Sequence, residues 1–395
     1  MEPKEKNSYS EVRSNNKISL IILLLSLVFF GLLYVLYLSR QDTETLKIKE
    51  FLENTLIELG KGSEDKVINQ ISGYENSAFI VYRDYLVECN SQSIRFMNKQ
   101  GNSLWEHQVK INKPLMKVSG KSLIIADMGG REIYAVNGSY IDWEKKFDEN
   151  IINVDVNSSG YVVVVKEAKG LKGAVTLFDS KGNEIFTKGY KDMYIMSAEI
   201  SPDNSSIVVN NFNTSGLAAY NSFEFLDMRG KTIAGVSAAS SLIFPAVSFI
   251  NKNHILVSGD AGVACYKTDG SLVWSNNFNG RKIYSSGVLE NNYAVVAVSG
   301  ENKPGTAGRN KPEILVLNSE GEITARVNID SEIININTYS DMIAVNTGRG
   351  VNFINRKGQL LGAFSSKTDI KNIYFFSRLE AAVITRQGAT IVKTH

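Results

Sequence analysis

The three histidines of this sequence are the first candidates for chemistry, and their spacing argues against a catalytic or metal centre. They are His107, His254 and His395, and none has the H-x-H, H-E-x-x-H or cysteine–histidine spacing of a zinc site. No G-x-S-x-G, P-loop or dinucleotide-binding sequence occurs in the context that its chemistry requires. We therefore expect no catalytic residue, no metal ion and no cofactor, and a protein that is not an enzyme.

The two cysteines, Cys89 and Cys265, are the only other nucleophiles of note. A disulfide-stapled scaffold of this length would need more cysteines. Neither stands beside a histidine or a basic cluster, which would lower the pKa of its thiol. We expect both to be buried, small apolar side chains.

Four carboxylates, Asp127, Asp155, Glu199 and Asp260, lie in apolar segments that resemble strands. Carboxylates that a fold gathers in one channel can hold a metal ion or perform acid–base chemistry. Whether these four meet depends on the elements that carry them.

A short repeat defines those elements. An apolar strand, a tight polar turn with glycine and a second strand recur along the chain, with the turn glycines 37 to 51 residues apart. Glycine supplies the positive φ that such a tight hairpin requires. The turn glycines are Gly101, Gly138, Gly182, Gly230, Gly270, Gly321 and Gly358.

Each repeat contains four strand-like runs within about 40 residues, which is typical of a β-propeller blade. We name the strands of a blade a, b, c and d, with the glycine turn between c and d. The last three runs of the chain match strands a, b and c, because Gly388 corresponds to Gly350 and the next turn glycine would fall just beyond His395. Val67–Ser72 is a spare strand that can supply the missing d strand and close the ring.

We therefore predict an all-β fold in which residues 66–395 form one β-propeller with eight four-stranded blades. Seven blades is the alternative. Strands a and b lie near the axis of a propeller, so the four carboxylates would be scattered over several blades. This arrangement favours solvated lining of the channel over a metal or catalytic site.

The glycine turn followed by leucine and tryptophan, as in Gly101-Asn-Ser-Leu-Trp105 and Asp269-Gly-Ser-Leu-Val-Trp274, resembles the repeats of pyrroloquinoline-quinone-like propellers. That family includes the outer-membrane assembly lipoprotein and quinoprotein dehydrogenases. The whole layout is similar to an uncharacterised clostridial family of membrane-anchored propellers, which implies a location at the cell surface. Many quinone enzymes use adjacent cysteines, and this chain has none, so the resemblance does not extend to a quinone cofactor.

Residues 18–38 form an uncharged, strongly apolar run, ISLIILLLSLVFFGLLYVLYL. As a helix this run would be about 30 Å long, which matches the hydrocarbon core of a bilayer. It is longer than the apolar part of a cleaved signal peptide, and no small-residue cleavage site follows it. We expect a single transmembrane helix, with residues 1–17 in the cytoplasm, a helical stalk over residues 39–65 and the propeller outside the cell.

Long loops on a rigid scaffold often carry recognition. All b–c loops and d–a connections of a propeller open on one face, and three b–c loops here are long: 166–173, 210–221 and 299–312. The candidate partner-binding residues are the basic residues of two of these loops. They are Lys166, Lys169, Lys172, Lys303, Arg309 and Lys311.

These features favour a non-enzymatic binding or scaffold module at the cell envelope, whose partner is a membrane or envelope protein or a cell-wall polymer. An enzyme that acts on envelope polysaccharide through the channel carboxylates is one alternative. A ligand sensor that works through a membrane partner is another. The net charge of +2 gives no field that would attract nucleic acid.

Overall fold

The computed structural model describes most of the chain after Asp65. The described residues are 66–74, 76–138, 140–214, 219–237, 243–259, 262–278, 280–300 and 311–395. The expected cytoplasmic tail, transmembrane helix and stalk lie outside this part of the chain, and so do Asp260, Lys303 and Arg309. Among the described residues, no helix combines the length and the apolar character needed to cross a membrane.

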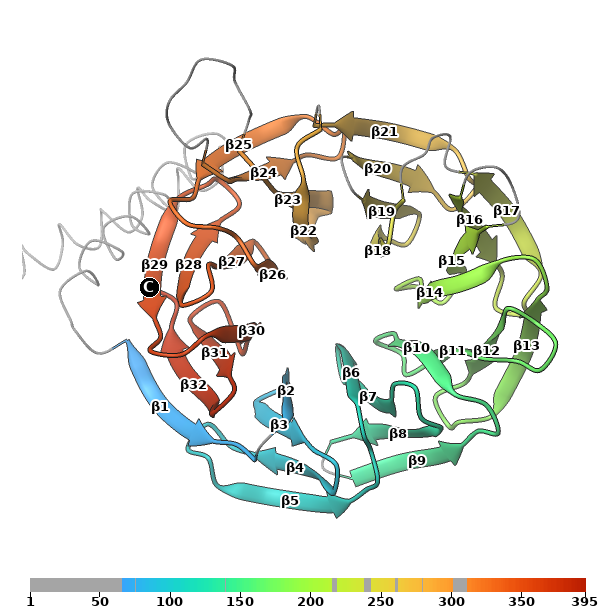
Figure 1. Ribbon diagram of the computed structural model, residues 1–395, viewed down its shortest axis with the longest axis horizontal. Helices are drawn as coiled ribbons and strands as arrows, with labels where there is room; N and C mark the ends of the chain where they lie inside the picture. Colours follow the sequence, from blue (N-terminus) through green and yellow to red (C-terminus); the bar gives the residue numbers. More distant parts are fainter. Residues whose placement is uncertain are drawn as a thin grey trace, which may run out of the picture. The chain divides into compact units, whose positions relative to one another are not determined.

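The described residues form eight antiparallel four-stranded sheets that surround a central axis like the blades of a propeller (Figure 1). This confirms the predicted eight-bladed fold, and the alternative of seven blades is wrong. Blades are numbered here in chain order, and their strands are given from the axis outward.

The first four blades follow the simple order a, b, c, d. Blade 1 contains β2 (Ala78–Tyr82), β3 (Tyr85–Cys89), β4 (Ser93–Met97) and β5 (Ser103–Gln108). Blade 2 contains β6 (Pro114–Ser119), β7 (Ser122–Asp127), β8 (Glu132–Asn137) and β9 (Tyr140–Lys146). Blade 3 contains β10 (Ile151–Val156), β11 (Val162–Lys166), β12 (Gly173–Phe178) and β13 (Glu184–Tyr190). Blade 4 contains β14 (Tyr194–Ile200), β15 (Ile207–Asn213), β16 (Tyr220–Leu226) and β17 (Thr232–Ser237).

Blades 5, 6 and 7 follow the same order. Blade 8 departs from it, because its outermost strand comes from the beginning of the described chain. Blade 5 contains β18 (Ala246–Asn251), β19 (His254–Gly259), β20 (Gly262–Lys267) and β21 (Leu272–Asn277). Blade 6 contains β22 (Ile283–Leu289), β23 (Tyr293–Val298), β24 (Glu313–Leu317) and β25 (Ile323–Asn328), with a 3-10 turn, η1 (Glu290–Asn292), between its first two strands. Blade 7 contains β26 (Asn335–Tyr339), β27 (Met342–Asn346), β28 (Gly350–Asn355) and β29 (Leu360–Ser365). Blade 8 contains β30 (Ile370–Phe375), β31 (Glu380–Thr385), β32 (Gly388–Lys393) and, outermost, β1 (Val67–Ser72).

The hydrophobic core lies between the blades. Strands b and c are covered on both faces by neighbouring blades, so they consist of continuous apolar runs. All of β12, for example, is buried. The outermost strands have only one covered face, and residues of β5 alternate between exposed and partly buried.

Interlocking contacts between blades explain the repeated turn glycine. Gly182 and Gly321 have positive φ values of 79° and 81°, which glycine adopts without strain. Trp143 of blade 2 covers the first of these glycines, and Trp274 of blade 5 covers the second, so closely that an added Cβ would lie 2.7 and 2.6 Å from the indole rings. The Trp274 Nε1–H also donates a hydrogen bond of 2.9 Å to the Ser319 carbonyl. Each such contact ties one blade to the next.

The ring closes through β1. This strand pairs antiparallel with β32, from Val67 opposite Val392 to Ser72 opposite Gly388. Gly388 has a φ of 138°, and an added Cβ there would lie only 2.0 Å from the Ile71 carbonyl oxygen, so no other residue fits. The Ile71 side chain in turn packs against the turn glycine of blade 1, Gly101.

The propeller has two faces with different connections. We call the face with the a–b and c–d turns the turn face, and the face with the b–c loops and d–a connections the loop face. Lys66 precedes β1 on the turn face, where its carbonyl accepts a hydrogen bond of 2.8 Å from the Lys393 N–H. The chain therefore joins the propeller on the turn face.

Candidate functional site

Two carboxylates approach each other in the central channel. Asp155 lies on β10 and Glu199 on β14, the innermost strands of adjacent blades. The Asp155 Oδ2 accepts a hydrogen bond of 3.2 Å from the N–H of Ile200, the residue after Glu199. Both side chains line the channel, and both are only partly exposed.

Their surroundings disfavour two negative charges. Burial raises the pKa of Asp155 to about 6, and the ammonium of Lys117 on β6 opposes this shift. Burial, followed by the charge of Asp155, raises the pKa of Glu199 to about 8. Burial and mutual repulsion therefore favour one proton shared by the pair, which is an arrangement suited to acid–base chemistry.

The other two predicted channel carboxylates do not join this pair in the described structure. Asp127 is 4% exposed and lies at the loop-face end of β7. Its Oδ1 accepts hydrogen bonds from the N–H groups of Asn112 (2.9 Å) and Lys113 (2.8 Å), which fixes a d–a connection. Asp260 lies outside the described residues.

A cavity of about 760 Å³ lies against the innermost strands β2, β6, β26 and β30. Its lining is mixed: apolar side chains such as Leu115 lie beside the charged Lys117 and the polar Asn372. The Asn372 Nδ2 donates a hydrogen bond of 2.8 Å to the Tyr374 hydroxyl. Lys117 therefore belongs both to this cavity and to the surroundings of Asp155.

The predicted basic residues lie in two separate loops. Lys169 is exposed on the blade 3 loop. On the same loop, the Lys172 Nζ donates a hydrogen bond of 2.9 Å to the Tyr194 hydroxyl and lies 4.5 Å from that ring's centroid. Lys166 instead forms an ion pair of 3.6 Å with Glu149.

Lys311 belongs to blade 6, where its Nζ lies 2.5 Å from a carboxylate oxygen of Asp330. Lys303 and Arg309 lie outside the described residues. The structure thus places Lys169 and Lys172 on one loop, Lys166 at the end of β11 just before that loop, and Lys311 on another blade.

Charge differs between the two faces. In the described loop-face connections, basic residues outnumber acidic ones by twelve to seven, whereas the turn-face connections carry ten basic and nine acidic residues. The basic loop-face residues are Lys110, Lys113, Arg131, Lys169, Lys172, Lys191, Arg281, Lys282, Lys311, Arg349, Lys367 and Arg386. The acidic ones are Asp148, Glu149, Glu167, Asp192, Asp330, Glu332 and Asp369. The loop face is therefore the basic face.

A groove with a volume of about 410 Å³ lies between β13 of blade 3 and strands β15, β16 and β17 of blade 4. We call it groove 3/4. Its charged groups satisfy one another. The Glu224 carboxylate accepts hydrogen bonds from the Lys188 Nζ (2.8 Å), the Tyr190 hydroxyl (2.6 Å) and the Thr232 hydroxyl (2.6 Å). Burial disfavours ionisation of Glu224, but these hydrogen bonds outweigh it and lower its pKa.

Two features of groove 3/4 leave it incomplete. Asn211 lines it and is 2% exposed, yet its Oδ1 accepts no hydrogen bond from the described residues. An unpaired buried acceptor of this kind costs about 1–3 kcal/mol. Gly235 of β17 pairs with Glu224, and a Cβ added there would meet nothing within 4 Å.

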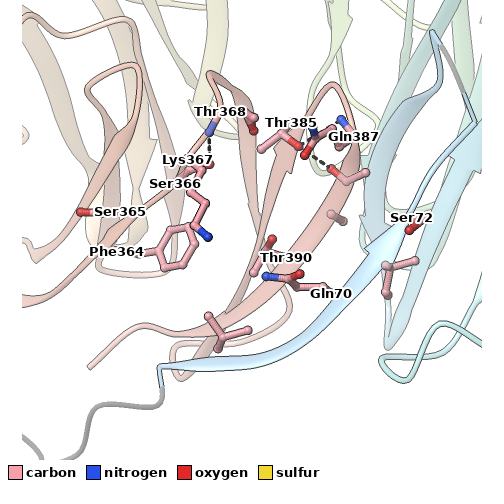
Figure 2. Close-up of a pocket in the computed structure, with 14 residues that line it drawn as sticks. Gln70, Ser72, Phe364, Ser365, Ser366, Lys367, Thr368, Thr385, Gln387 and Thr390 are labelled. Carbon is pink, nitrogen blue, oxygen red and sulfur yellow. Dashed lines mark hydrogen bonds between the residues drawn. The ribbon is translucent and has the colours of Figure 1, made fainter.

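An equivalent groove lies between blades 7 and 8, with a volume of about 350 Å³ (Figure 2). We call it groove 7/8. The strand registers place Gln70 where groove 3/4 has Gly235, and Thr390 where it has Glu224. Figure 2 shows Gln70 beside Thr390. Thr385 takes the place of Asn211, and its Oγ1 is hydrogen-bonded to the Gln387 N–H (3.2 Å).

The family comparison covers nearly the whole described chain. A family model with the description "family of unknown function (DUF5711)" matches residues 61–394. The chain belongs to this family. No curated protein matches the sequence.

Solved structures that resemble this DUF5711 chain share its fold. BamB from Moraxella catarrhalis is 14% identical, with a TM-score of 0.55 over 82% of this chain and 96% of that one. Sqt1 from Saccharomyces cerevisiae is 10% identical, with a TM-score of 0.63 over 84% of this chain and 99% of that one. The dihydro-heme d1 dehydrogenase NirN is 14% identical, with a TM-score of 0.58 over 83% of this chain and 74% of that one. At these identities the likeness establishes the propeller fold alone.

The remaining candidate side chains have structural environments in this DUF5711 propeller. Cys89 and Cys265 are buried, and burial raises the pKa of their thiols to about 12 and about 11. The His107 ring stacks on Trp105, with centroids 5.8 Å apart. Among the described residues, no three His, Cys, Asp or Glu side chains are placed to hold a metal ion.

Sequence analysis missed groove 3/4. The signal for it was Gly235, a glycine inside a strand and away from any turn, which often marks a position that another group approaches closely. The groove itself depends on side chains of two blades, and no sequence pattern relates them.

Proposed function

We propose that this protein is a non-enzymatic binding module anchored in the cell membrane by residues 18–38, with its N-terminus in the cytoplasm and its propeller outside the cell. Its partner is an acidic envelope protein or an acidic cell-wall polymer. The uncharged run of residues 18–38 supports the anchor, because its length as a helix matches the bilayer core.

The observation that carries this proposal is the excess of basic residues on the loop face. A surface with one dominant sign of charge attracts partners of the opposite sign and accelerates their association. Lys110, Lys113, Lys169, Lys172 and Lys191 are all exposed, and they lie in the connections around blades 2, 3 and 4. Lys191 lines groove 3/4, and Lys172 lies on the loop that is hydrogen-bonded to Tyr190 beside it.

The entry point of the chain supports the loop face as the binding surface. Lys66 lies on the turn face, so the described chain enters the propeller at the end opposite to the b–c loops.

The test is capture of the partner in intact cells with a membrane-impermeant crosslinker, using the full-length protein. The loop-face variant carries Lys110→Gln, Lys113→Gln, Lys169→Gln, Lys172→Gln and Lys191→Gln. We expect it to recover much less of the partner than the wild type does, since the attraction is electrostatic and also weakens at high salt. Lys166 is left intact because its ion pair with Glu149 is structural.

The matched control is a turn-face variant with the same number of exposed charges removed. It carries Lys121→Gln, Lys181→Gln, Arg229→Gln, Lys231→Gln and Lys252→Gln. Its recovery of the partner should equal that of the wild type. Equal losses in the two variants would show that net charge, and not the loop face, controls capture.

A second candidate function rests on the channel pair. Burial raises the pKa values of both Asp155 and Glu199, which suits a pair of carboxyl groups acting as acid and base on an envelope polysaccharide. If the protein is such an enzyme, it releases reducing ends from cell-wall polysaccharide, and Asp155→Asn and Glu199→Gln each abolish the release. Asp179→Asn, on the turn face, is the control. No release by the wild type would exclude this function.

A further inference from the structure

We propose that groove 3/4 is a pocket for one tyrosine or tryptophan side chain of a polypeptide partner, and that acidic residues flank this side chain in the partner's sequence. This inference rests on the proposed binding function and names the chemistry of its partner. Four observations carry it: the open position at Gly235, the saturated charges, the unpaired Asn211 acceptor and the exposed lysines of the fixed blade 3 loop beside the groove.

The open position provides the space. Gly235 has no positive φ that would require glycine, and a Cβ there would meet no atom within 4 Å. In the equivalent groove the same register position carries Gln70. Tyr190 and Met193 line the same groove, so the missing side chain at Gly235 leaves room there for a side chain from outside.

The saturated charges define what kind of side chain fits. Both carboxylate oxygens of Glu224 already accept hydrogen bonds, and the Lys188 ammonium donates to Glu224 and Thr232. Most hydrogen-bonding sites of these groups are therefore occupied. A charged ligand, or a sugar with many hydroxyl groups, would find few hydrogen-bond partners in the groove. A mainly apolar side chain is the better match.

The Asn211 acceptor adds one polar requirement. Its Oδ1 lacks a donor among the described residues, so a bound side chain with a single N–H or O–H would complete the site. Tyrosine and tryptophan combine a large apolar ring with one such donor. The propeller itself uses this combination where the Trp274 indole docks on the neighbouring blade and donates to the Ser319 carbonyl.

The rim of groove 3/4 is rigid and carries both signs of charge. Lys191 and Asp192 both line the groove and are exposed. The blade 3 loop is fixed beside it, because the Lys172 N–H donates a hydrogen bond of 2.7 Å to the Tyr190 carbonyl and Leu171 packs over Gly189. Exposed ammonium groups on a fixed loop favour aspartate or glutamate next to the inserted ring.

The experiment is selection from a random peptide library displayed on phage, against the full-length protein in nanodiscs. We expect the selected peptides to share a tyrosine or tryptophan with adjacent acidic residues. A synthetic peptide of the shared sequence should bind the Gly235→Leu variant at least about tenfold more weakly than the wild type. The leucine side chain would occupy the space that the peptide's aromatic ring needs, and such a ring contributes strongly to binding. Gln70→Leu, in groove 7/8, is the matched control and should leave the affinity unchanged.

The Asn211→Leu variant tests the hydrogen bond separately. Replacing the peptide's tyrosine or tryptophan by phenylalanine should weaken binding to the wild type but not to Asn211→Leu, which is the result of a double-mutant cycle for one shared contact. Thermal unfolding is measured for each variant as a control. A midpoint temperature at or above that of the wild type shows that the fold is intact.

Three results would overturn the inference. They are selected peptides without an aromatic donor, peptide affinities that Gly235→Leu leaves unchanged, and no peptide enriched over empty nanodiscs. The proposed function is judged separately by the loop-face and turn-face variants. Partner capture that depends on the loop-face lysines but not on Gly235 would preserve the function and reject this pocket.

Discussion

Grooves 3/4 and 7/8 occupy equivalent positions on opposite sides of the ring, four blades apart (Figure 1). In groove 7/8 the chain closes on itself: Gln70 and Thr390 pair across β1 and β32, and the Thr385 hydroxyl is hydrogen-bonded. In groove 3/4 the corresponding positions hold Gly235, which leaves space, and Asn211, which leaves an acceptor unpaired.

The difference indicates that groove 7/8 has a structural role and that groove 3/4 does not. Groove 7/8 joins the two ends of the propeller, so any loss of contact there weakens the whole ring. Groove 3/4 lies within continuous chain, and its neighbours are held by ordinary strand connections. An unfilled space can therefore persist in groove 3/4 at small cost, and it is available for binding.

Glycine-to-alanine substitutions should give the largest difference in stability between the two grooves. Gly388→Ala places a methyl group 2.0 Å from the Ile71 carbonyl oxygen and strains a φ of 138°, so β1 must shift. We expect a loss of about 3 kcal/mol in unfolding free energy. Gly235→Ala meets nothing within 4 Å. It should be neutral or stabilise by about 0.5–1 kcal/mol, because alanine loses less entropy on folding.

Thermal or urea unfolding of both variants checks this pair. A fall in stability for both would mean that groove 3/4 is packed as tightly as the closure. Equal, small effects would mean that β1 does not hold the ring closed.

The Glu224 carboxylate in groove 3/4 should make the stability of the propeller fall at acidic pH. Its pKa is lowered in the folded state, so the stability that it contributes is present above its unfolded pKa of about 4.3 and is lost as the pH falls through the folded pKa. Glu224→Gln should cost about 1 kcal/mol at pH 7, a modest figure because the carboxylate is partly exposed and solvent screens its charge.

The same variant should lose less stability than the wild type between pH 6 and strongly acidic pH, as measured by urea unfolding at each pH. Thr390→Val, at the equivalent position of groove 7/8, is the control and should leave the pH dependence unchanged. A pH profile of Glu224→Gln that runs parallel to the wild type would contradict the network of Lys188, Tyr190 and Thr232.

The smallest effects should come from the polar positions deep in the two grooves. Thr385→Val removes a hydroxyl whose hydrogen bonds are made and should cost about 1 kcal/mol. Asn211→Leu removes a buried acceptor that has no donor, so its unfolding free energy should not fall and should rise by about 1 kcal/mol. A larger loss for Asn211→Leu than for Thr385→Val would show that Asn211 already has its partners.

The sequence predicts the propeller well because its signals are local. Turn glycines such as Gly182 and Gly321 are required by positive φ values, and their spacing counts the blades. Counting from Gly350 to Gly388 also indicated that the last blade lacked a strand, and β1 occupies that place.

The candidate sites are less predictable because they depend on distant contacts. The length and composition of the loop with Lys169 and Lys172 indicate a recognition loop. The ion pair of Lys166 with Glu149 joins the end of β11 to a d–a connection, and no sequence pattern predicts it. Groove 3/4 depends on the absence of a side chain at Gly235 beside Tyr190 of another blade. The pairing of Asp155 with Glu199, and the separation of Asp127 from both, likewise follow from how the blades pack.

Labelling of single cysteines in intact cells tests most directly whether the loop face of an external propeller binds the partner. The native thiols Cys89 and Cys265 are buried, so a cysteine introduced by Lys169→Cys on the loop face or Lys181→Cys on the turn face would dominate labelling by a membrane-impermeant maleimide. The account predicts that both variants are labelled in intact cells, and that the captured partner protects the loop-face cysteine alone. Labelling of both only after lysis, or equal protection of the two faces, would contradict it.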